Sequence, residues 1–257
     1  MHDNCEGVAH RGGSVLAPEN TLAAFRHALS LSVDAIELDV QMSHDGHPIV
    51  FHDETVEKLT NGQGNVLDLD LTYLRTLNAA AHFPGGWSQA EQIPTLSEVL
   101  DLAHADNRRV YIEIKPSKRG DVYGRYPGIA EAVTHEVLAA DMLEHVLIMS
   151  FDWEILPQVK MLAPGVQTGA LVSDDAWNPR ADNALSTLVT QVRQLQCEWI
   201  NLDFKLFTPE MPAFFHTNGY KLGIWTVNGE ADLQRLASAG VDSLTTDRPD
   251  LLRVFSH

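Results

Sequence analysis

Short apolar runs rich in β-branched residues alternate along the chain with longer stretches in which apolar residues recur every third or fourth position. The short runs predict strands and the longer stretches predict helices. Strands are expected at residues 7–10, 35–40, 109–114, 146–150, 167–171, 199–203, 221–225 and 243–246. Helices are expected at residues 21–31, 129–141, 153–162, 184–195, 209–218 and 230–239. Because about eight strands alternating with helices are what a closed barrel requires, we predict an α/β fold of the (β/α)8 barrel type.

Residues 55–93 break this alternation, because they contain no strong strand and no long helix. Loops of this length in a compact domain are usually functional or disordered, and the aromatic residues Phe83 and Trp87 argue against disorder. We therefore interpret about residues 55–93 as a small insertion that follows the second strand and its hairpin. A single barrel domain is expected to cover residues 1–257.

Composition and charge limit the partners of such a domain. A chain of 257 residues that is 44% hydrophobic can bury one large core. With 35 acidic and 18 basic residues its formal charge is −17, and it has no Lys/Arg run, so we expect no nucleic-acid partner and no stable membrane association. Two cysteines, Cys5 and Cys197, are too few for a disulfide framework, and the N-terminus shows no signal-peptide pattern. We expect a cytoplasmic protein that is a monomer or a homodimer.

Carboxylates recur at the ends of two predicted strands. Glu37 and Asp39 are two residues apart, so they point to the same face of their strand. On their own they fit equally well a polar barrel layer neutralised by basic side chains and a cation site. Glu113 ends another predicted strand, with Lys115 two residues further on. Three carboxylates at the mouth of a barrel offer only oxygen ligands, which favours Mg²⁺ or Ca²⁺ over zinc.

Two histidines are expected at the same rim of the barrel. His10 closes the first predicted strand, and His52 follows a short strand at residues 48–51. A single histidine at a strand end is more often structural than catalytic. Two of them beside three carboxylates favour an acid/base pair.

Basic and aromatic side chains complete the set of candidates. Arg11 and Lys115 are suited to binding a phosphate, or they form salt bridges with the carboxylates. Trp225 ends a predicted strand and is either core filler or an aromatic wall for an organic substrate or a quaternary ammonium group. Phe151, just past another strand, is a less certain substrate-binding partner.

Four segments resemble the glycerophosphodiester phosphodiesterase family, above all its short cytosolic bacterial members. They read AHRGGSVLAPENTLAAF, DAIELDVQMSHDGHPIVFHD, YIEIKP and GIWTVNGEADLQRLASAGVDSLTTDRPDLL. The resemblance extends from Val8 almost to Leu252, and four motifs in this order and spacing are highly specific. It departs from the family at Lys58-Leu59-Thr60, where Arg-Thr-Thr is usual, which puts the contacts of the insertion in doubt.

This resemblance implies a TIM barrel with a small insertion over the catalytic face. It implies one divalent cation held by Glu37, Asp39 and Glu113, acid/base catalysis by His10 and His52, phosphate contacts from Arg11 and Lys115, and an aromatic substrate contact from Trp225. The implied reaction is hydrolysis of glycerophosphodiesters, such as glycerophosphocholine and glycerophosphoethanolamine, to glycerol 3-phosphate and an alcohol.

Several alternatives stay open at this point. Either histidine can be the acid, and either water or the glycerol 2-hydroxyl can attack the phosphorus, the second route giving a cyclic phosphate. Other enzymes of the same barrel superfamily cleave lysophospholipids in the manner of a phospholipase D. A barrel that binds glycerophosphodiesters or a metal without turnover is a further alternative, which the complete set of acid/base and metal positions disfavours.

Overall fold

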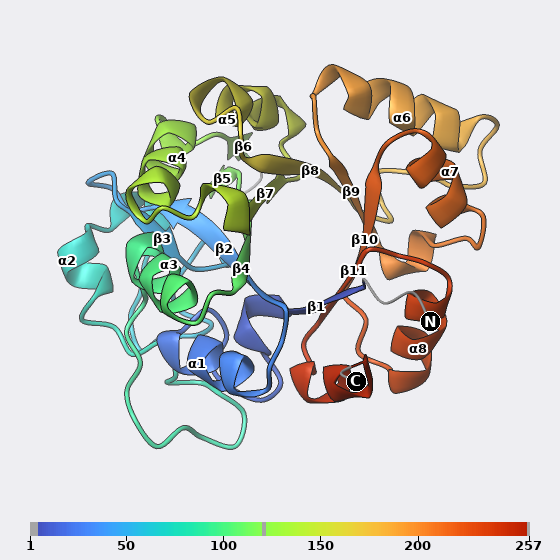
Figure 1. Cartoon of the computed structure of the whole chain (residues 1–257). Helices are drawn as coiled ribbons and strands as arrows, with labels where there is room; N and C mark the ends of the chain where they lie inside the picture. The colour runs from blue at the N-terminus through green and yellow to red at the C-terminus, as the bar shows by residue number, and fades with distance from the viewer. Residues whose placement is uncertain (1–4, 120–121, 256–257) are drawn as a thin grey trace.

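The computed structural model of the chain describes residues 5–119 and 122–255. In these residues eight parallel strands close into a barrel (Figure 1). They are β1 (Glu6–Ala9), β2 (Ala35–Met42), β4 (Arg109–Ile114), β7 (Val146–Ser150), β8 (Gln167–Val172), β9 (Trp199–Asp203), β10 (Lys221–Trp225) and β11 (Ser243–Thr246). Neighbouring strands pair in the order β1, β11, β10, β9, β8, β7, β4, β2, and pairing of β2 with β1 closes the ring. The predicted (β/α)8 barrel is confirmed.

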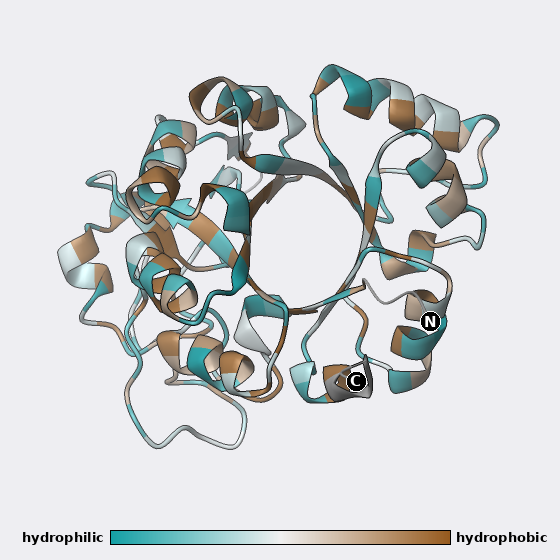
Figure 2. Cartoon of the chain, in the orientation of Figure 1, coloured by the Kyte–Doolittle hydropathy of each residue, from teal (hydrophilic) through white to brown (hydrophobic). Residues whose placement is uncertain are grey.

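Helices surround the barrel on its outside (Figure 1). They are α1 (Leu22–Ser30), α3 (Leu96–Ala105), α4 (Ile129–Ala139), α5 (Leu156–Leu162), α6 (Ala184–Gln194), α7 (Met211–Thr217) and α8 (Glu230–Ser238). Short 3-10 helices are η1 (His10–Gly12), η2 (Val66–Asp68), η3 (Leu143–His145), η4 (Trp153–Ile155), η5 (Phe204–Leu206) and η6 (Pro249–Phe255). Each outer helix carries both apolar and polar residues, as amphipathic helices do (Figure 2). Helix α3 is absent from the sequence-based expectations, although Thr95 and Glu98 form a capping box at its start.

Strand β2 shows how the barrel separates its two faces. Ile36, Leu38 and Val40 are fully buried in the apolar layer between the strands and the helices. The alternate residues Glu37 and Asp39 therefore point into the barrel. Large apolar side chains fill the barrel below these carboxylates, among them Tyr111 and Trp199, which pack edge to face.

Two segments after β2 and β4 lie outside the barrel wall. Strand β3 (Pro48–Val50) pairs antiparallel with β2, which confirms the predicted hairpin. Helix α2 (Leu71–Leu74) belongs to residues 55–93, and this segment contributes to a separate apolar cluster that includes Val56 and Ile93. A second hairpin, which the sequence pattern did not reveal, joins β5 (Ser117–Arg119) to β6 (Val122–Gly124) directly after β4.

The structure also bears on the cysteines and on membrane-crossing helices. Cys5 and Cys197 are free thiols. Within residues 5–119 and 122–255, no helix has the length and apolar character needed to cross a bilayer.

Candidate active site

Three buried carboxylates meet at the upper end of the barrel interior. Asp39 on β2 lies directly opposite Glu113 on β4, and Glu37 lies one inward position below Asp39. Their exposed fractions are 3% for Glu37, 0% for Asp39 and 8% for Glu113. One oxygen from each of the three lies within 4.8 Å of the others. Strand register thus assembles the group that the spacing predicted.

The turn after β1 brings Arg11 to these carboxylates. Arg11 has a left-handed backbone conformation (φ 50°), and its amide donates a 2.9 Å hydrogen bond to Oε2 of Glu37. Gly12 and Gly13 follow, also at positive φ. A Cβ on Gly12 would lie 2.8 Å from the backbone of Ala24, so the chain needs glycine for this close approach.

Both basic side chains form ion pairs with the carboxylates. Nε of Arg11 lies 3.1 Å from Oδ2 of Asp39, and Nη1 donates to Oε1 of Glu19 at 2.8 Å. Nζ of Lys115 lies 2.8 Å from Oε1 of Glu113 and 3.5 Å from Oδ1 of Asp39. Arg11 and Lys115 also line the cavity above, so the salt-bridge role and the phosphate role expected for them are compatible.

The carboxylates of this cluster differ in how readily they ionise. Although burial opposes ionisation, Arg11 and then Lys115 hold the pKa of Asp39 below its usual range. Burial raises the pKa of Glu37 to about 7, and the neighbouring Asp39 and Glu113 add to this effect. Arg11 and Lys115 thus act most strongly on Asp39, whereas Glu37 keeps its proton over part of the working pH range, with Nε2 of His10 3.9 Å from its Oε2.

The donor set fits a hard divalent cation. Oδ1 of Asp39 and Oε1 of Glu113 are buried, and among the described residues neither receives a hydrogen bond of normal geometry, despite the nearby Lys115 ammonium. Carboxylate oxygens are the ligands that Mg²⁺ and Ca²⁺ prefer. A cation beside these oxygens would also favour the ionised form of the nearby Glu37.

Each of the two histidines has an aspartate partner. Nδ1 of His10 lies 2.6 Å from Oδ1 of Asp247, and Nδ1 of His52 lies 2.8 Å from Oδ1 of Asp53. If Nδ1 donates to the carboxylate, Nε2 of each ring is left for proton transfer. Burial opposes the charged form of His10, but Glu37 and the hydrogen bond to Asp247 outweigh it and raise the pKa of His10.

Several of these supporting residues went unassigned in the sequence. Asp247 follows the last strand, where the position of His10 after the first strand could have indicated it, since first and last strands are neighbours in a closed barrel. Asp53 stands next to His52. Asn20 donates a 2.8 Å hydrogen bond to Oδ2 of Asp39, and Glu19 pairs with Arg11.

A cavity of about 180 Å³, here called the inner chamber, contains the chemical groups. Phe151 and Trp225 form one wall, with ring centroids 5.5 Å apart and ring planes at 86°. Nε1 of Trp225 donates to the carbonyl of Asn201 at 3.1 Å and fixes this ring. Of the predicted site residues, His10, Arg11, Glu37, His52, Glu113, Lys115, Phe151 and Trp225 line the inner chamber, and Asp39 lies beneath them.

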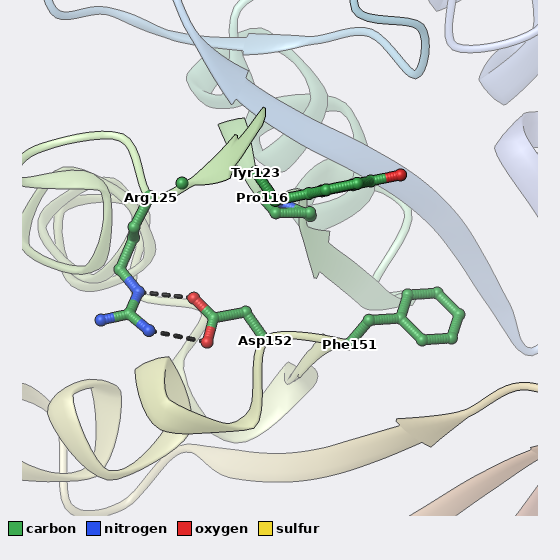
Figure 3. A pocket seen from close by; sticks show the side chains of 6 residues that line it. Pro116, Tyr123, Arg125, Phe151 and Asp152 are labelled. Carbon is green, nitrogen blue, oxygen red and sulfur yellow. Dashed lines mark hydrogen bonds and ion pairs between the residues drawn. The ribbon is translucent and has the colours of Figure 1, made fainter. Parts of the chain in front are cut away.

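A larger cavity of about 630 Å³, here called the outer chamber, adjoins the inner one. His52, Lys115 and Phe151 line both. The β5–β6 hairpin contributes Lys118 and Tyr123 to its lining, and the rim beside it is shown in Figure 3.

Sequence and structure both relate the chain to known phosphodiesterases. Residues 10–251 match the Glycerophosphoryl diester phosphodiesterase family. The chain is 39% identical over 245 residues to the glycerophosphodiester phosphodiesterase of Caldanaerobacter subterraneus subsp. tengcongensis, with 95% of each protein covered. It is 33% identical over 257 residues to the glycerophosphodiester phosphodiesterase of Bacillus subtilis, with 95% of this chain and 84% of the relative covered. A phosphodiesterase of Oleispira antarctica, solved in complex with the product sn-glycerol-3-phosphate, has a TM-score of 0.81 at 26% identity and covers 98% of this chain and 96% of its own.

Proposed function

This chain belongs to the glycerophosphoryl diester phosphodiesterase family, and from that premise we propose that it hydrolyses glycerophosphodiesters such as glycerophosphocholine and glycerophosphoethanolamine to glycerol 3-phosphate and an alcohol. One observation supports this reaction most strongly. Two histidines, each paired with an aspartate, border the same enclosed chamber as a cluster of three carboxylates and two basic side chains.

The carboxylates of Glu37, Asp39 and Glu113 would hold one divalent cation, Mg²⁺ or Ca²⁺. Such an ion supplies positive charge for the phosphate oxygens and activates a bound oxygen nucleophile. The protein itself binds and orients the substrate with its own side chains. Arg11 and Lys115 stay protonated over the working pH range, because although burial opposes their charge, Asp39 and Glu113 raise their pKa values.

A phosphodiester carries one negative charge, and more charge develops on its non-bridging oxygens as the nucleophile arrives. Arg11 and Lys115 line the inner chamber and bind those oxygens. One histidine accepts a proton from the attacking hydroxyl, of water or of the glycerol moiety, while the other protonates the leaving alkoxide. Attack by the glycerol hydroxyl gives a cyclic phosphate, which a water molecule must then open to yield glycerol 3-phosphate. Asp247 and Asp53 hold the two imidazole rings through Nδ1. Phe151 and Trp225 pack against the carbon atoms of the substrate.

Release of glycerol 3-phosphate from glycerophosphocholine tests this function. We expect chelation of divalent ions, Glu37→Gln or His52→Ala to abolish it, since a positioned acid or base contributes roughly 10²–10⁴ in rate. His44→Ala is a matched control, because His44 also pairs with an aspartate, Asp70 at 3.0 Å, but on the exposed surface. Full activity after any of the three treatments would contradict the proposal.

The same assay distinguishes the alternatives. Turnover of lysophosphatidylcholine in preference to glycerophosphocholine would indicate lysophospholipid cleavage, and tight binding of glycerophosphocholine without turnover would indicate a binding protein. The cytoplasmic location and the monomeric or dimeric state stay predictions. Gel filtration and cell fractionation would test them.

A further inference from the structure

The outer chamber has a lining unlike that of the inner chamber, and it suggests which substrates the protein selects. The argument rests on the proposed hydrolysis. Every glycerophosphodiester shares its glycerol phosphate part and differs in its alcohol. The shared part fits the small inner chamber, where the phosphate-binding side chains lie. His52, Lys115 and Phe151 border both chambers, so the scissile bond lies at that boundary and the alcohol extends into the outer chamber.

Acidic and basic side chains both line the outer chamber, and they are not all paired with one another. Its lysines are Lys58, which lies 3.1 Å from Asp53, Lys115, which is engaged by the carboxylates of the inner chamber, and Lys118, whose ammonium lies over the Tyr123 ring. Glu54 and Asp175 also line the outer chamber, and in the described part of the chain no ion pair joins either to a basic side chain. Oε2 of Glu54 is buried and has no hydrogen-bond partner there. A buried carboxylate oxygen in this state attracts a cation.

Glu54 is held by a fixed stretch of backbone. Nε2 of Gln41 donates to the carbonyls of Phe51 and Asp53, both at 2.8 Å. The hydroxyl of Tyr126 in turn donates to Oε1 of Gln41 at 2.7 Å, within the protein interior. These bonds anchor the backbone on both sides of His52, next to Glu54.

Two aromatic rings line the outer chamber. Tyr123 on β6 and Phe151 after β7 project to the same side of the rim in Figure 3. Arg125 and Asp152 tie these two segments together through hydrogen bonds of 2.5 and 2.6 Å. Nζ of Lys118 lies 5.2 Å from the Tyr123 ring centroid, so this ring already accepts an ammonium group.

We infer that the outer chamber is the subsite for the leaving alcohol and that it selects alcohols carrying an amine or a quaternary ammonium group. The Glu54 carboxylate supplies the counter-charge, and the rings of Tyr123 and Phe151 supply cation–π and apolar contacts. The preference concerns the substrate's leaving group and is separate from the chemistry of the inner chamber. Of residues 55–93, only Thr55 and Lys58 line this subsite, so the β5–β6 hairpin is the larger source of selectivity.

The test compares kcat/KM for three substrates with the metal-loaded enzyme: glycerophosphocholine, glycerophosphoethanolamine and glycerophosphoglycerol, whose leaving alcohol is uncharged. We expect the wild type to prefer the first two. Glu54→Gln should lower kcat/KM by about three- to tenfold for the two substrates whose alcohol is cationic and leave kcat/KM for glycerophosphoglycerol unchanged. Tyr123→Leu should affect the choline substrate most. Free choline should inhibit the wild type competitively and Glu54→Gln more weakly.

Matched controls separate selectivity from a structural effect. Glu57→Gln changes a carboxylate on the same loop whose Oε1 accepts from the Gly64 amide, outside the chamber, and Tyr73→Leu removes an exposed tyrosine elsewhere. Both should keep the wild-type substrate ratios. Unchanged ratios in Glu54→Gln and Tyr123→Leu, or equal losses on all three substrates, would overturn the subsite alone. Failure of the wild type to release glycerol 3-phosphate from any substrate would overturn the proposed hydrolysis and the subsite with it.

Discussion

The two histidine–aspartate pairs have the same local geometry but are built differently. His10 and Asp247 come from opposite ends of the chain, and their side chains are each 18% exposed. His52 and Asp53 are adjacent in sequence, and the His52 side chain is 28% exposed. Asp53 also pairs with Lys58, whose side chain is 65% exposed. One pair therefore depends on the closure of the whole barrel, whereas the other depends on a single loop, and the two should respond differently to mutation and pH.

Replacing the aspartate of each pair should give the largest difference between the pairs, measured as the loss of kcat/KM. Asp247→Asn should lower kcat/KM by about 10- to 100-fold, because an amide in place of the carboxylate no longer holds His10 with its proton on Nδ1. Asp53→Asn should cost less, since His52 is more open to water, which can take over part of the hydrogen bonding. Release of glycerol 3-phosphate and the pH profile of kcat/KM measure both.

Asp70→Asn is the matched control, because Asp70 pairs with the exposed His44 outside both chambers. It should leave kcat/KM unchanged. Equal losses in Asp247→Asn and Asp53→Asn would erase the distinction between the pairs.

The partly buried His10–Asp247 pair should make the stability of the fold depend on pH. Burial opposes the charge of Asp247, but its hydrogen bond from His10 lowers its pKa, while Glu37 and Asp247 raise the pKa of His10. The contribution of Asp247 is present above its unfolded pKa of about 3.9 and is lost as pH falls through the lower folded value. That of His10 is complete below its unfolded pKa of about 6.5 and is lost as pH rises through the higher folded value.

The Tm difference between wild type and Asp247→Asn should therefore be largest between about pH 4 and 6.5 and shrink on both sides. Thermal unfolding of the chelated proteins from pH 3 to 9 measures it. A difference that does not vary with pH would show that this pair contributes no charge interaction to folding.

The smallest expected effects are losses of stability on removing the side chains that contact the two aspartates, Ser14 at Asp247 and Lys58 at Asp53. Oγ of Ser14 donates to Oδ1 of Asp247 at 2.6 Å in a partly buried position, so Ser14→Ala should destabilise the fold by about 1–2 kcal/mol. Lys58→Ala removes an exposed ion pair with Asp53 and should cost about 0–1 kcal/mol. Urea unfolding compares the two, and a larger loss in Lys58→Ala would reverse the ranking of the pairs.

The two pairs also differ in how much of each could be predicted from the sequence. Strand positions follow from local patterns, and Glu37, Asp39 and Glu113 follow from strand alternation and strand ends. Asp53 could have been read from its neighbour His52. The bond from His10 to Asp247 spans 237 positions and exists because β1 pairs with β11, which no local pattern states.

The β5–β6 hairpin was missed for a different physical reason. Its residues 117–119 and 122–124 are exposed or half-buried, so no core selects an apolar alternation in them. Tyr123, for which we propose a role in selectivity, thus lies in a hairpin that the pattern of apolar residues does not predict.

The pairing of the first and last barrel strands has a consequence during synthesis of the chain. Ala9 on β1 pairs with Thr246 on β11, and the next residue on each strand is His10 or Asp247. During synthesis, every other element of the barrel is already on the growing polypeptide before the partner of His10 leaves the ribosome. A nascent or truncated chain that stops short of β11 lacks Asp247, so His10 has no aspartate partner in it, although His52 and Asp53 are already present.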